Sequence, residues 1–293
     1  MADKPNEKRV IVPCLTKTTP TLDLLHEKTL LWGKPKSGKS SLASQFPGAY
    51  FIATERGHDA LSINGTDCGE WDDVLAILRG LADGNHPFQT IVVDTVDNMW
   101  FFCESDLRAK KQIEYEGDME YGKGFRMIAN EFRRVLTQLS NLPYGFVLIS
   151  HAEEEEVGEG KGSYRRQWPT IAKKALPIVL GMVDLCVFLD ETYVMDDETK
   201  RMAPGRVLRT KASRGWAAGD RTGILPETIS LGTSAEQAWK AFSGAWLTGG
   251  GRIGDVGARA DAPATGVAAT VTQAQTETTP APQQNATSDG RKK

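Results

Sequence analysis

The sequence predicts an α/β fold, because short apolar runs typical of buried strands alternate with segments whose apolar residues recur at helical spacing. The predicted strands lie at residues 30–32, 49–54, 89–94, 144–150, 184–189, 193–195 and 206–211. The predicted helices lie at residues 41–46, 71–81, 123–141, 171–182 (with a kink at Pro177) and 235–246. Polar residues follow several of these strands directly, and the carboxyl ends of strands are where α/β sheets place their chemistry.

The most specific motif lies between the first predicted strand and the first predicted helix, and it fits the pattern G-x-x-x-x-G-K-[ST]. It consists of Gly33, Lys34, Pro35, Lys36, Ser37, Gly38, Lys39 and Ser40, with Ser41 next along the chain. The two glycines let the backbone curl so that successive N–H groups point at a phosphate above the positive end of a helix. Lys39 would neutralise the β- and γ-phosphates, and the Ser40 hydroxyl would ligate Mg²⁺. We therefore expect ATP and Mg²⁺ as ligands; the alternative is a surface loop rich in glycine, serine and lysine.

Carboxylates follow two of the apolar strands. Asp94 ends the strand at 89–94 and is expected to hold Mg²⁺ through water, opposite the phosphate loop. Thr95 comes next, not a glutamate, so the base that polarises the attacking water must come from elsewhere. Glu55, directly after the strand at 49–54, is the best-placed candidate, since it would orient a water in line with the γ-phosphate. The alternative for Glu55 is a solvated acid at a strand exit.

His151 directly follows the strand at 144–150. A polar side chain at this position would lie beside the γ-phosphate and could sense its presence. The alternative is a structural histidine whose hydrogen bonds are satisfied within the protein.

Aromatic and basic residues interleave in two stretches, a composition that suits stacking on bases and contacting the phosphates of a single strand. The candidate DNA-binding residues are Trp100, Arg108, Lys110, Lys111, Tyr164, Arg165, Arg166 and Trp168. We expect residues 100–121 to be irregular; the alternative is an amphipathic helix with its aromatic end in the core and its charges solvated. Residues 153–168 begin with four glutamates and predict a long mobile loop.

A basic, glycine-containing segment follows the last predicted strand. Its charged members include Lys211, Arg214 and Arg221. Such residues could reach into the nucleotide site of a neighbouring subunit. The alternative is an exposed basic loop.

Length and composition limit the remaining possibilities. The chain has 293 residues, 40% of them hydrophobic, and a formal net charge of −3, so any nucleic-acid site must be a local patch. Four scattered cysteines favour buried free thiols in a reducing cytosol. No apolar run approaches the roughly 18 residues of a membrane span, so we expect no membrane association and a cytoplasmic location. We divide the chain into an N-terminal lead (1–27), a nucleotide-binding domain (28–247) and a disordered low-complexity tail (248–293).

The order of these motifs resembles the ATPase core of the RecA superfamily over about residues 29–231. It looks most like the compact phage ATP-binding proteins related to RecA that serve as single-strand annealing proteins. The resemblance implies a mostly parallel central sheet flanked by helices, assembly into a ring or filament, and the host cytoplasm if the chain is phage-encoded. By this likeness, Glu55 matches the catalytic glutamate and Asp94 the metal-site acid, while His151 stands where RecA-type recombinases carry a glutamine that couples the γ-phosphate to DNA.

The same likeness assigns roles to the other segments. Residues 100–121 and 152–168 fall where the family places its two DNA-binding loops, and Lys211, Arg214 and Arg221 fall where trans-acting basic residues are found. The first hypothesis is a Mg²⁺-dependent ATPase that acts on single-stranded DNA in annealing, recombination or repair. Its expected partners are single-stranded DNA, further copies of itself, and a single-strand-binding protein or replication partner.

Hypotheses from other classes stay open. The acidic net charge and the four glutamates at 153–156 are typical of an assembly protein that is switched by nucleotide and acts on a protein partner without DNA. A small-molecule kinase with a phosphate loop is disfavoured, because no lid rich in arginine is evident.

Overall fold

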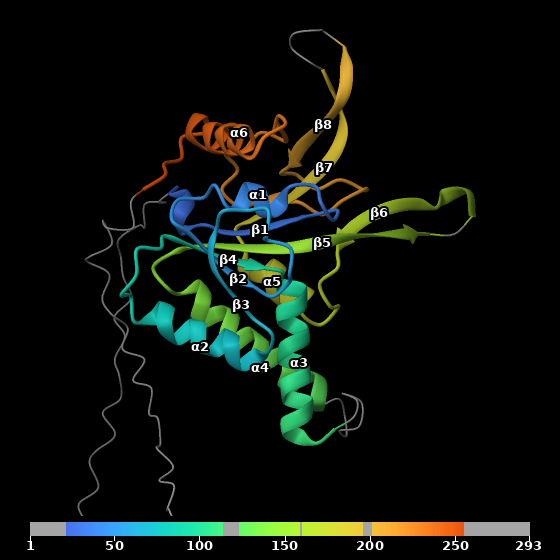
Figure 1. Ribbon diagram of the computed structural model, residues 1–293. Coiled ribbons are helices and arrows are strands. Elements are labelled where there is room, and N and C mark those ends of the chain that lie inside the picture. The colour runs from blue at the N-terminus through green and yellow to red at the C-terminus, as the bar shows by residue number, and fades with distance from the viewer. Residues whose placement is uncertain (1–21, 114–122, 159, 196–200, 255–293) are drawn as a thin grey trace, which may run out of the picture. The chain divides into compact units, whose positions relative to one another are not determined.

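A mostly parallel sheet lies at the centre of the fold (Figure 1). The computed structural model describes residues 22–113, 123–158, 160–195 and 201–254, which all belong to one compact unit. The parallel strands run, in spatial order, as β7 (Leu185–Met195), β1 (Lys28–Gly33), β5 (Gly145–Val157), β4 (Thr90–Asp94), β2 (Ala49–Ala53) and β3 (Asn64–Asp67). This arrangement confirms the predicted α/β fold.

Antiparallel strands extend the sheet beyond β7 and form two hairpins. β8 (Met202–Arg209) pairs with β7, and β10 (Thr228–Ser230) pairs with β8. β9 (Gly219–Asp220) pairs with the start of β7, and β6 (Tyr164–Pro169) pairs with the second half of β5. In Figure 1 the β5–β6 and β7–β8 hairpins project from the sheet as two separate arms.

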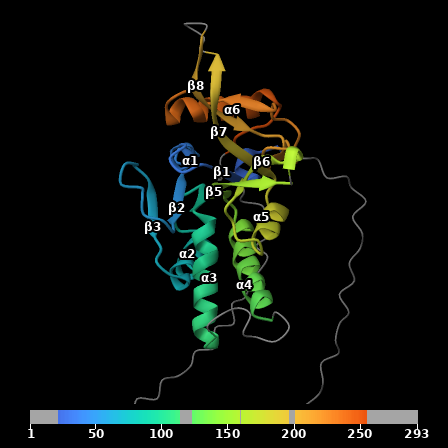
Figure 2. The same cartoon turned by 90° about the vertical axis from the view of Figure 1, so that its right-hand side faces the viewer.

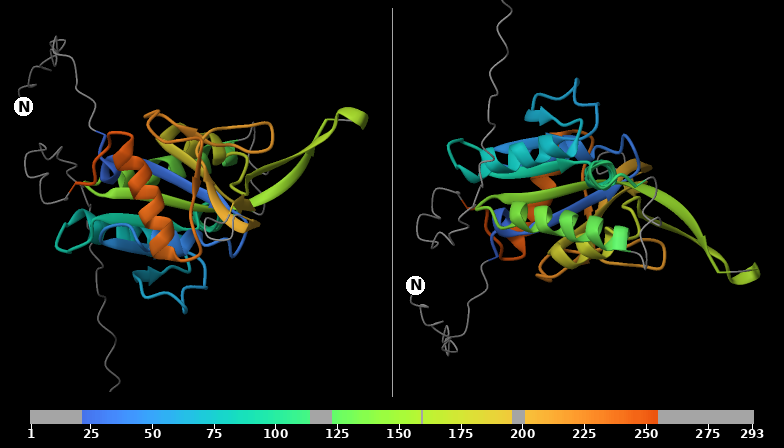
Figure 3. Two further views of the ribbon diagram at one scale, coloured as in Figure 1. Left: turned by 90° about the horizontal axis from the view of Figure 1, so that it is seen from above. Right: turned by 90° about the horizontal axis from the view of Figure 1, so that it is seen from below.

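The side chains of the central strands alternate between two hydrophobic clusters, one on each face of the sheet. Leu30 and Trp32 of β1 join the cluster formed with α2 (Trp71–Ala82), α3 (Val96–Lys111), α4 (Lys123–Ser140) and α5 (Leu176–Met182). Leu31 joins the cluster on the other face, with α1 (Lys39–Ala43) and α6 (Ala235–Thr248). Figure 3 shows α6 across one face and α2 and α4 across the other, and α3 packs against α4 (Figure 2). Short 3-10 turns lie at η1 (Leu24–His26) and η4 (Gly160–Gly162).

The prediction of an irregular stretch from residue 100 is wrong for the part that the structure describes, where α3 continues to Lys111. The Thr95 side chain caps the helix by accepting from the Asn98 N–H. Val96, Met99, Trp100 and Cys103 are buried at helical spacing, so the apolar side of the helix anchors it to the core. The alternative of an amphipathic helix is the one observed. Residues 114–121 of this stretch lie outside the described residues.

The prediction of a mobile loop at 153–168 is also wrong, because most of this segment forms the β5–β6 hairpin. Glu155 lies opposite Arg166, and Glu156 opposite Arg165, across the two antiparallel strands. Opposite charges facing each other stabilise a strand pair without an apolar face. The hairpin therefore has no run of apolar residues that would predict its strands.

Other boundaries differ in smaller ways. The predicted helix at 171–182 begins only at Leu176, and Pro177 lies in its first turn, where a missing N–H costs no hydrogen bond, so the helix has no kink there. The two strands predicted at 184–189 and 193–195 are one strand, β7, because β8 pairs with it without a break from Phe188 to Met195. The helix predicted at 41–46 starts two residues earlier, at Lys39, and the strand predicted at 206–211 spans Met202–Arg209.

Some predictions concern residues outside the described part. These are the part of the N-terminal lead before residue 22, the cysteine at position 14, and the tail from residue 255 on. The described cysteines, Cys68, Cys103 and Cys186, are buried free thiols, and burial raises the pKa of each. Within the ranges that the structure describes, no helix is both long and apolar enough to cross a bilayer.

The packing of α4 against α3 predicts a large difference between two phenylalanines. Phe132 is fully buried, with its ring edge-on to Trp100 at 5.1 Å between centroids, whereas Phe101 is 58% exposed. Phe132→Ala should lower the free energy of unfolding by about 3–5 kcal/mol because it leaves a cavity. Phe101→Ala, the matched control, should change it by about 0.5 kcal/mol or less. Urea unfolding measures both, and equal losses would contradict this account of the core.

Candidate nucleotide-binding site

The carboxyl ends of β1, β2 and β4 lie at one edge of the sheet, together with His151 in the middle of β5. The strand register places Gly33 beside His151 and Asp94 beside Ala53. A cavity of about 540 Å³ opens there, lined by the phosphate loop, by residues between Glu55 and Leu61, by Asp94 and by His151. The structure therefore brings together the phosphate loop and all three polar residues that the sequence placed at strand ends.

The backbone of the phosphate loop requires both of its glycines. Gly38 has a φ of 100°, a left-handed conformation that side chains disfavour. A side chain at Gly33 would collide with the Leu189 carbonyl oxygen on β7. The Leu42 N–H donates to the Gly38 carbonyl (2.9 Å), which joins the loop directly to α1.

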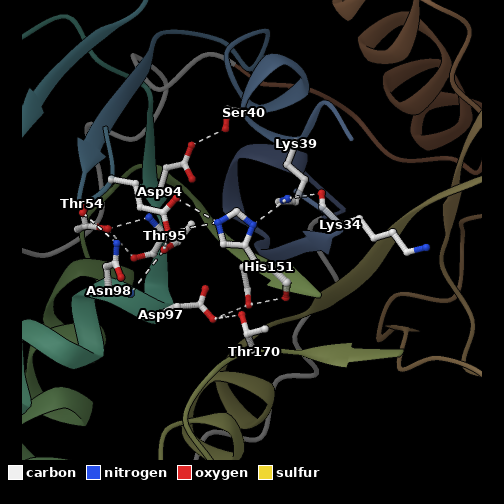
Figure 4. A network of polar contacts seen from close by, with 12 residues as sticks. Lys34, Lys39, Ser40, Thr54, Asp94, Thr95, Asp97, Asn98, His151 and Thr170 are labelled. Atoms are coloured by element: carbon white, nitrogen blue, oxygen red, sulfur yellow. Dashed lines mark hydrogen bonds and ion pairs between the residues drawn. The ribbon is translucent and has the colours of Figure 1, made fainter. Parts of the chain in front are cut away.

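Lys39 is held inside the loop by neutral acceptors. Its Nζ donates to the carbonyl oxygens of Gly33 (2.9 Å) and Lys34 (2.8 Å) and lies 3.5 Å from His151 Nδ1 (Figure 4). Burial lowers the pKa of Lys39, although the negative charges of Asp94, Asp97 and Glu55 oppose the shift. Phosphate oxygens would offer this amine stronger, charge-assisted acceptors than the two carbonyls.

Ser40 and Asp94 form a pair of oxygen donors suited to Mg²⁺. Ser40 Oγ donates to Asp94 Oδ2 over 2.5 Å, and His58 Nε2 lies 3.4 Å from the same oxygen. Burial raises the pKa of Asp94, and the hydrogen bond from Ser40 opposes the shift. A hydroxyl beside a carboxylate fits a hard cation that keeps several waters. A magnesium ion bound by this pair would take its remaining ligands from phosphate and water. Within the described ranges, no cluster of three or more His, Cys, Asp or Glu side chains is suited to a metal.

His151 connects the phosphate loop to Glu55. Its Nε2 lies 3.1 and 3.2 Å from the two carboxylate oxygens of Glu55, while Nδ1 faces Lys39. The ammonium of Lys39 can only donate, so Nδ1 is the acceptor and Nε2 carries the proton that faces Glu55. Figure 4 shows the His151 ring between Lys39 and Thr95.

Thr95 supports Glu55 from the other side. Its hydroxyl donates to Glu55 Oε1 (2.8 Å), and its N–H donates to Thr54 Oγ1 (2.7 Å). The Asp94–Thr95 peptide bond is cis. The residue that stands in place of a glutamate after Asp94 thus holds the carboxylate that the sequence nominated as the base.

Sequence reasoning missed Asp97, which joins the site to the β5–β6 hairpin. Asp97 Oδ1 accepts from Ser150 Oγ (3.0 Å) and Thr170 Oγ1 (2.6 Å), and the Thr170 N–H donates to the His151 carbonyl (3.0 Å). Burial raises the pKa of Asp97, and the two hydroxyl donors oppose the shift. The position of Asp97, an acid in the first helical turn after a strand, could have indicated its role. No sequence pattern indicated that His58 lies at the site.

The first group of predicted DNA-binding residues does not form a shared surface. Trp100 is 6% exposed and packs in the core. Arg108 pairs with Glu104 at 3.5 Å, and Lys110 pairs with Asp106 at 2.8 Å and Asp72 at 3.6 Å. Lys111 is exposed at the end of α3.

The second group is brought together with the loop after β8. Tyr164, Arg166 and Trp168 alternate along β6 and line a groove of about 430 Å³ with Arg214 and Trp216. The Arg166 guanidinium lies 4.3 Å from the Trp168 ring centroid, and that of Arg214 lies 5.1 Å from the Tyr164 ring centroid. Arg165 is 80% exposed and pairs with Glu154 at 3.1 Å.

The three basic residues proposed to act in trans do not form one group in the fold. Arg214 lies at the groove, whereas Arg221 pairs with Asp184 at 2.6 Å. The Asp184 N–H donates to the Lys28 carbonyl at the start of β1, so Arg221 lies at the end of the strands opposite the cavity. Lys211 is exposed, and its carbonyl accepts from the Trp216 ring N–H.

The buried carboxylate of Asp94 is expected to lower the stability of the folded protein when it is ionised. Because burial raises the carboxyl pKa in the folded protein, the ionised form destabilises the fold, and this cost grows as the pH rises above the unfolded value of about 4. Asp94→Asn should therefore raise the melting temperature measured without nucleotide at pH 7–8, and the gain should shrink as the pH falls towards about 4. Asp67→Asn, on the exposed strand β3, is the control and should give no gain. A lower melting temperature for Asp94→Asn at neutral pH would refute this assignment.

Comparison with known proteins agrees with the geometry. Residues 26–222 match a family model described as an AAA domain, a range that contains the phosphate loop, Glu55, Asp94 and His151. No match was found among curated proteins. Since the matched range covers more than half of the 293 residues, the chain belongs to this family of AAA domains, a group of P-loop ATPase-like nucleotide-binding domains.

Proposed function

We propose that this protein is a Mg²⁺-dependent ATPase with a RecA-like core that acts on single-stranded DNA. One observation carries the ATPase part: Lys39, His151 and Glu55 form a continuous chain of polar contacts around one cavity, beside the Ser40–Asp94 pair. A nucleotide-binding P-loop needs the lysine and the oxygen pair. Hydrolysis also needs a carboxylate that can orient water, and Glu55 supplies it.

Each side chain has a defined task in this mechanism. Lys39 would exchange its two carbonyl acceptors for oxygens of the β- and γ-phosphates, and Ser40 together with Asp94 would hold a magnesium ion. Bound magnesium neutralises charge on the phosphates. Glu55 accepts a hydrogen bond from the attacking water and orients it in line with the γ-phosphate.

His151 couples the two halves of the site. Its Nδ1 accepts from Lys39 and its Nε2–H donates to Glu55. When Lys39 binds phosphate, Nδ1 loses its donor, and among the described residues the His151 ring is then held only by its contact with Glu55. Binding of the nucleotide is thereby communicated to the base, and through the Thr170–Asp97–Ser150 contacts to the β5–β6 hairpin.

The role of Glu55 gives a sharp test. Glu55→Gln keeps a hydrogen-bond acceptor for Thr95 but removes the carboxylate charge, so MgATP affinity should be retained while hydrolysis falls about 10²–10⁴-fold. Binding is measured by calorimetry, and turnover by phosphate release. Glu236→Gln, on the exposed surface of α6, is the matched control and should hydrolyse ATP normally. Unchanged turnover by Glu55→Gln would move the base to another residue.

The groove beside the hairpin supports single-stranded DNA as the substrate. Tyr164, Trp168 and Trp216 offer ring faces for bases, and Arg214 offers a cation for a phosphate. Among the described residues, no ion pair neutralises Arg214. Trp168 in the groove lies two residues before Thr170, whose N–H donates to the His151 carbonyl (3.0 Å). A strand bound in the groove would therefore contact a segment that is hydrogen-bonded to the nucleotide site.

Removing an aromatic ring from the groove should weaken DNA binding. Trp168→Ala should raise the Kd for a fluorescent oligo-dT about 5- to 100-fold, because stacking of one base contributes about 1–3 kcal/mol. Tyr193→Ala removes an exposed ring on β7 and serves as the control, with no expected change. Anisotropy at two salt concentrations, with MgATP present, measures both variants. Equal affinities for Trp168→Ala and the wild type would exclude the groove as the DNA site.

One observation favours the second candidate, a nucleotide-switched assembly protein that acts on a protein partner without DNA. The described strands of the β5–β6 arm carry Glu153, Glu154, Glu155 and Glu156 but only two arginines, each paired with a glutamate. Such an acidic arm suits a basic protein surface and repels phosphates. An ATPase rate unaffected by oligonucleotide, with no DNA binding in MgATP, would favour this function over the first.

Assembly stays a prediction. A ring or filament with Lys211, Arg214 or Arg221 acting on a neighbour's nucleotide, and a single-strand-binding protein as a further partner, are part of the proposal. Sedimentation with and without MgATP would measure the assembly.

A further inference from the structure

An arginine outside the sequence motif lies against the phosphate loop. Arg206, on β8, directs Nη1 into the space that a side chain at Gly38 would need, and no other group approaches that position as closely among the described residues. Arg206 is distant from Gly38 in the sequence, and no sequence pattern indicates that it lies at the phosphate loop. Only the tertiary fold brings it to the loop.

The rest of the guanidinium is fixed in place by backbone carbonyls. Arg206 Nε and Nη2 donate to the Gly232 carbonyl (3.3 and 3.2 Å), and Nη2 also donates to the Ser234 carbonyl (3.3 Å). Ser234 caps α6 through a reciprocal pair of hydrogen bonds with Gln237, and Gly232 has a φ of 65°. Both carbonyls are therefore held in fixed directions before any ligand arrives.

The segment that holds Arg206, residues 232–234, is also connected to the phosphate loop through helix packing. α6 packs on the end of α1, with the Trp239 ring 4.7 Å from the Phe46 ring between centroids. Since α1 begins directly after Gly38, the loop, α1, α6 and Arg206 form one connected unit. A guanidinium preorganised in this way loses little side-chain entropy when it binds an anion.

The charge of Arg206 is not neutralised by the acid opposite it in the strand register. Its cross-strand neighbour on β7 is Glu191, but no ion pair joins these two described side chains, and the acceptors that hold the guanidinium are neutral carbonyls. A full positive charge thus lies close to the loop that also carries Lys39. Such a pair of cations favours a polyanion between or beside them.

We propose that Arg206 is a nucleotide-binding residue that acts in cis, donating from Nη1 to the phosphate chain at Gly38. This role rests on the nucleotide binding proposed above, and it adds to it a contact supplied by β8 and held by residues 232–234, which lie beyond the range matched by the family model.

The test compares two substitutions by calorimetric titration with MgATP. Arg206→Met keeps the apolar stem but removes the charge, and it should weaken binding about 10- to 100-fold, the range for a charge-assisted hydrogen bond. Arg206→Lys keeps the charge and should lose clearly less MgATP affinity than Arg206→Met. The wild-type affinity should also fall more steeply with salt than that of Arg206→Met, because one cation contact is missing from the variant. Arg79→Met, exposed on α2, is the matched control and should bind as the wild type does.

The outcomes separate the possibilities. Unchanged MgATP affinity of Arg206→Met would overturn the proposal. An equal loss in Arg206→Met and Arg206→Lys, with unchanged salt dependence and a lowered melting temperature, would also overturn it, since that pattern reports only lost packing. A wild-type protein that binds no MgATP would instead remove the proposed function itself.

Discussion

The geometry of the cavity depends on the register of β5, which pairs with β1 on one side and β4 on the other. This register sets His151 beside the phosphate loop and carries it to within hydrogen-bond distance of Glu55 at the end of β2. A shift of one residue would exchange the side chains that enter the two hydrophobic clusters, such as Val147 and Leu148. The packing of the two clusters therefore fixes the geometry of the site.

That geometry holds charged groups in places where burial disfavours their ionised forms. The pKa of Lys39 is lowered, and the pKa values of Asp94 and Asp97 are raised, in each case mainly by burial. Hydroxyl and carbonyl partners offset part of that cost, and each of these partners belongs to a different strand, loop or helix. A ligand that replaces one partner consequently changes the balance at the others. Such a connected network is a physical route from phosphate binding to the hairpin.

The sequence was sufficient to predict the phosphate loop, the buried strands and the meeting of Glu55, Asp94 and His151, because parallel strands place their carboxyl ends at one edge. It could not predict the β5–β6 hairpin, whose strands pair through charges, such as Arg166 with Glu155, and have no apolar pattern. Trp100 was ambiguous, because an aromatic residue near basic ones suits both a stacking surface and a helix core. Contacts such as Arg206 with Gly38 arise only from strands that are distant in sequence.

The proposed function depends above all on contact between Lys39 and the phosphates of a nucleotide in this cavity. An ATP analogue with a reactive acyl group on its γ-phosphate transfers that group to a lysine amine in reach, and burial makes deprotonation of Lys39 easier by lowering its pKa. Mass spectrometry of the labelled protein identifies the lysine. We expect labelling at Lys39, and we expect excess MgATP to prevent it. Labelling confined to lysines away from the cavity, such as Lys110 and Lys240, and unaffected by MgATP would contradict the proposed function.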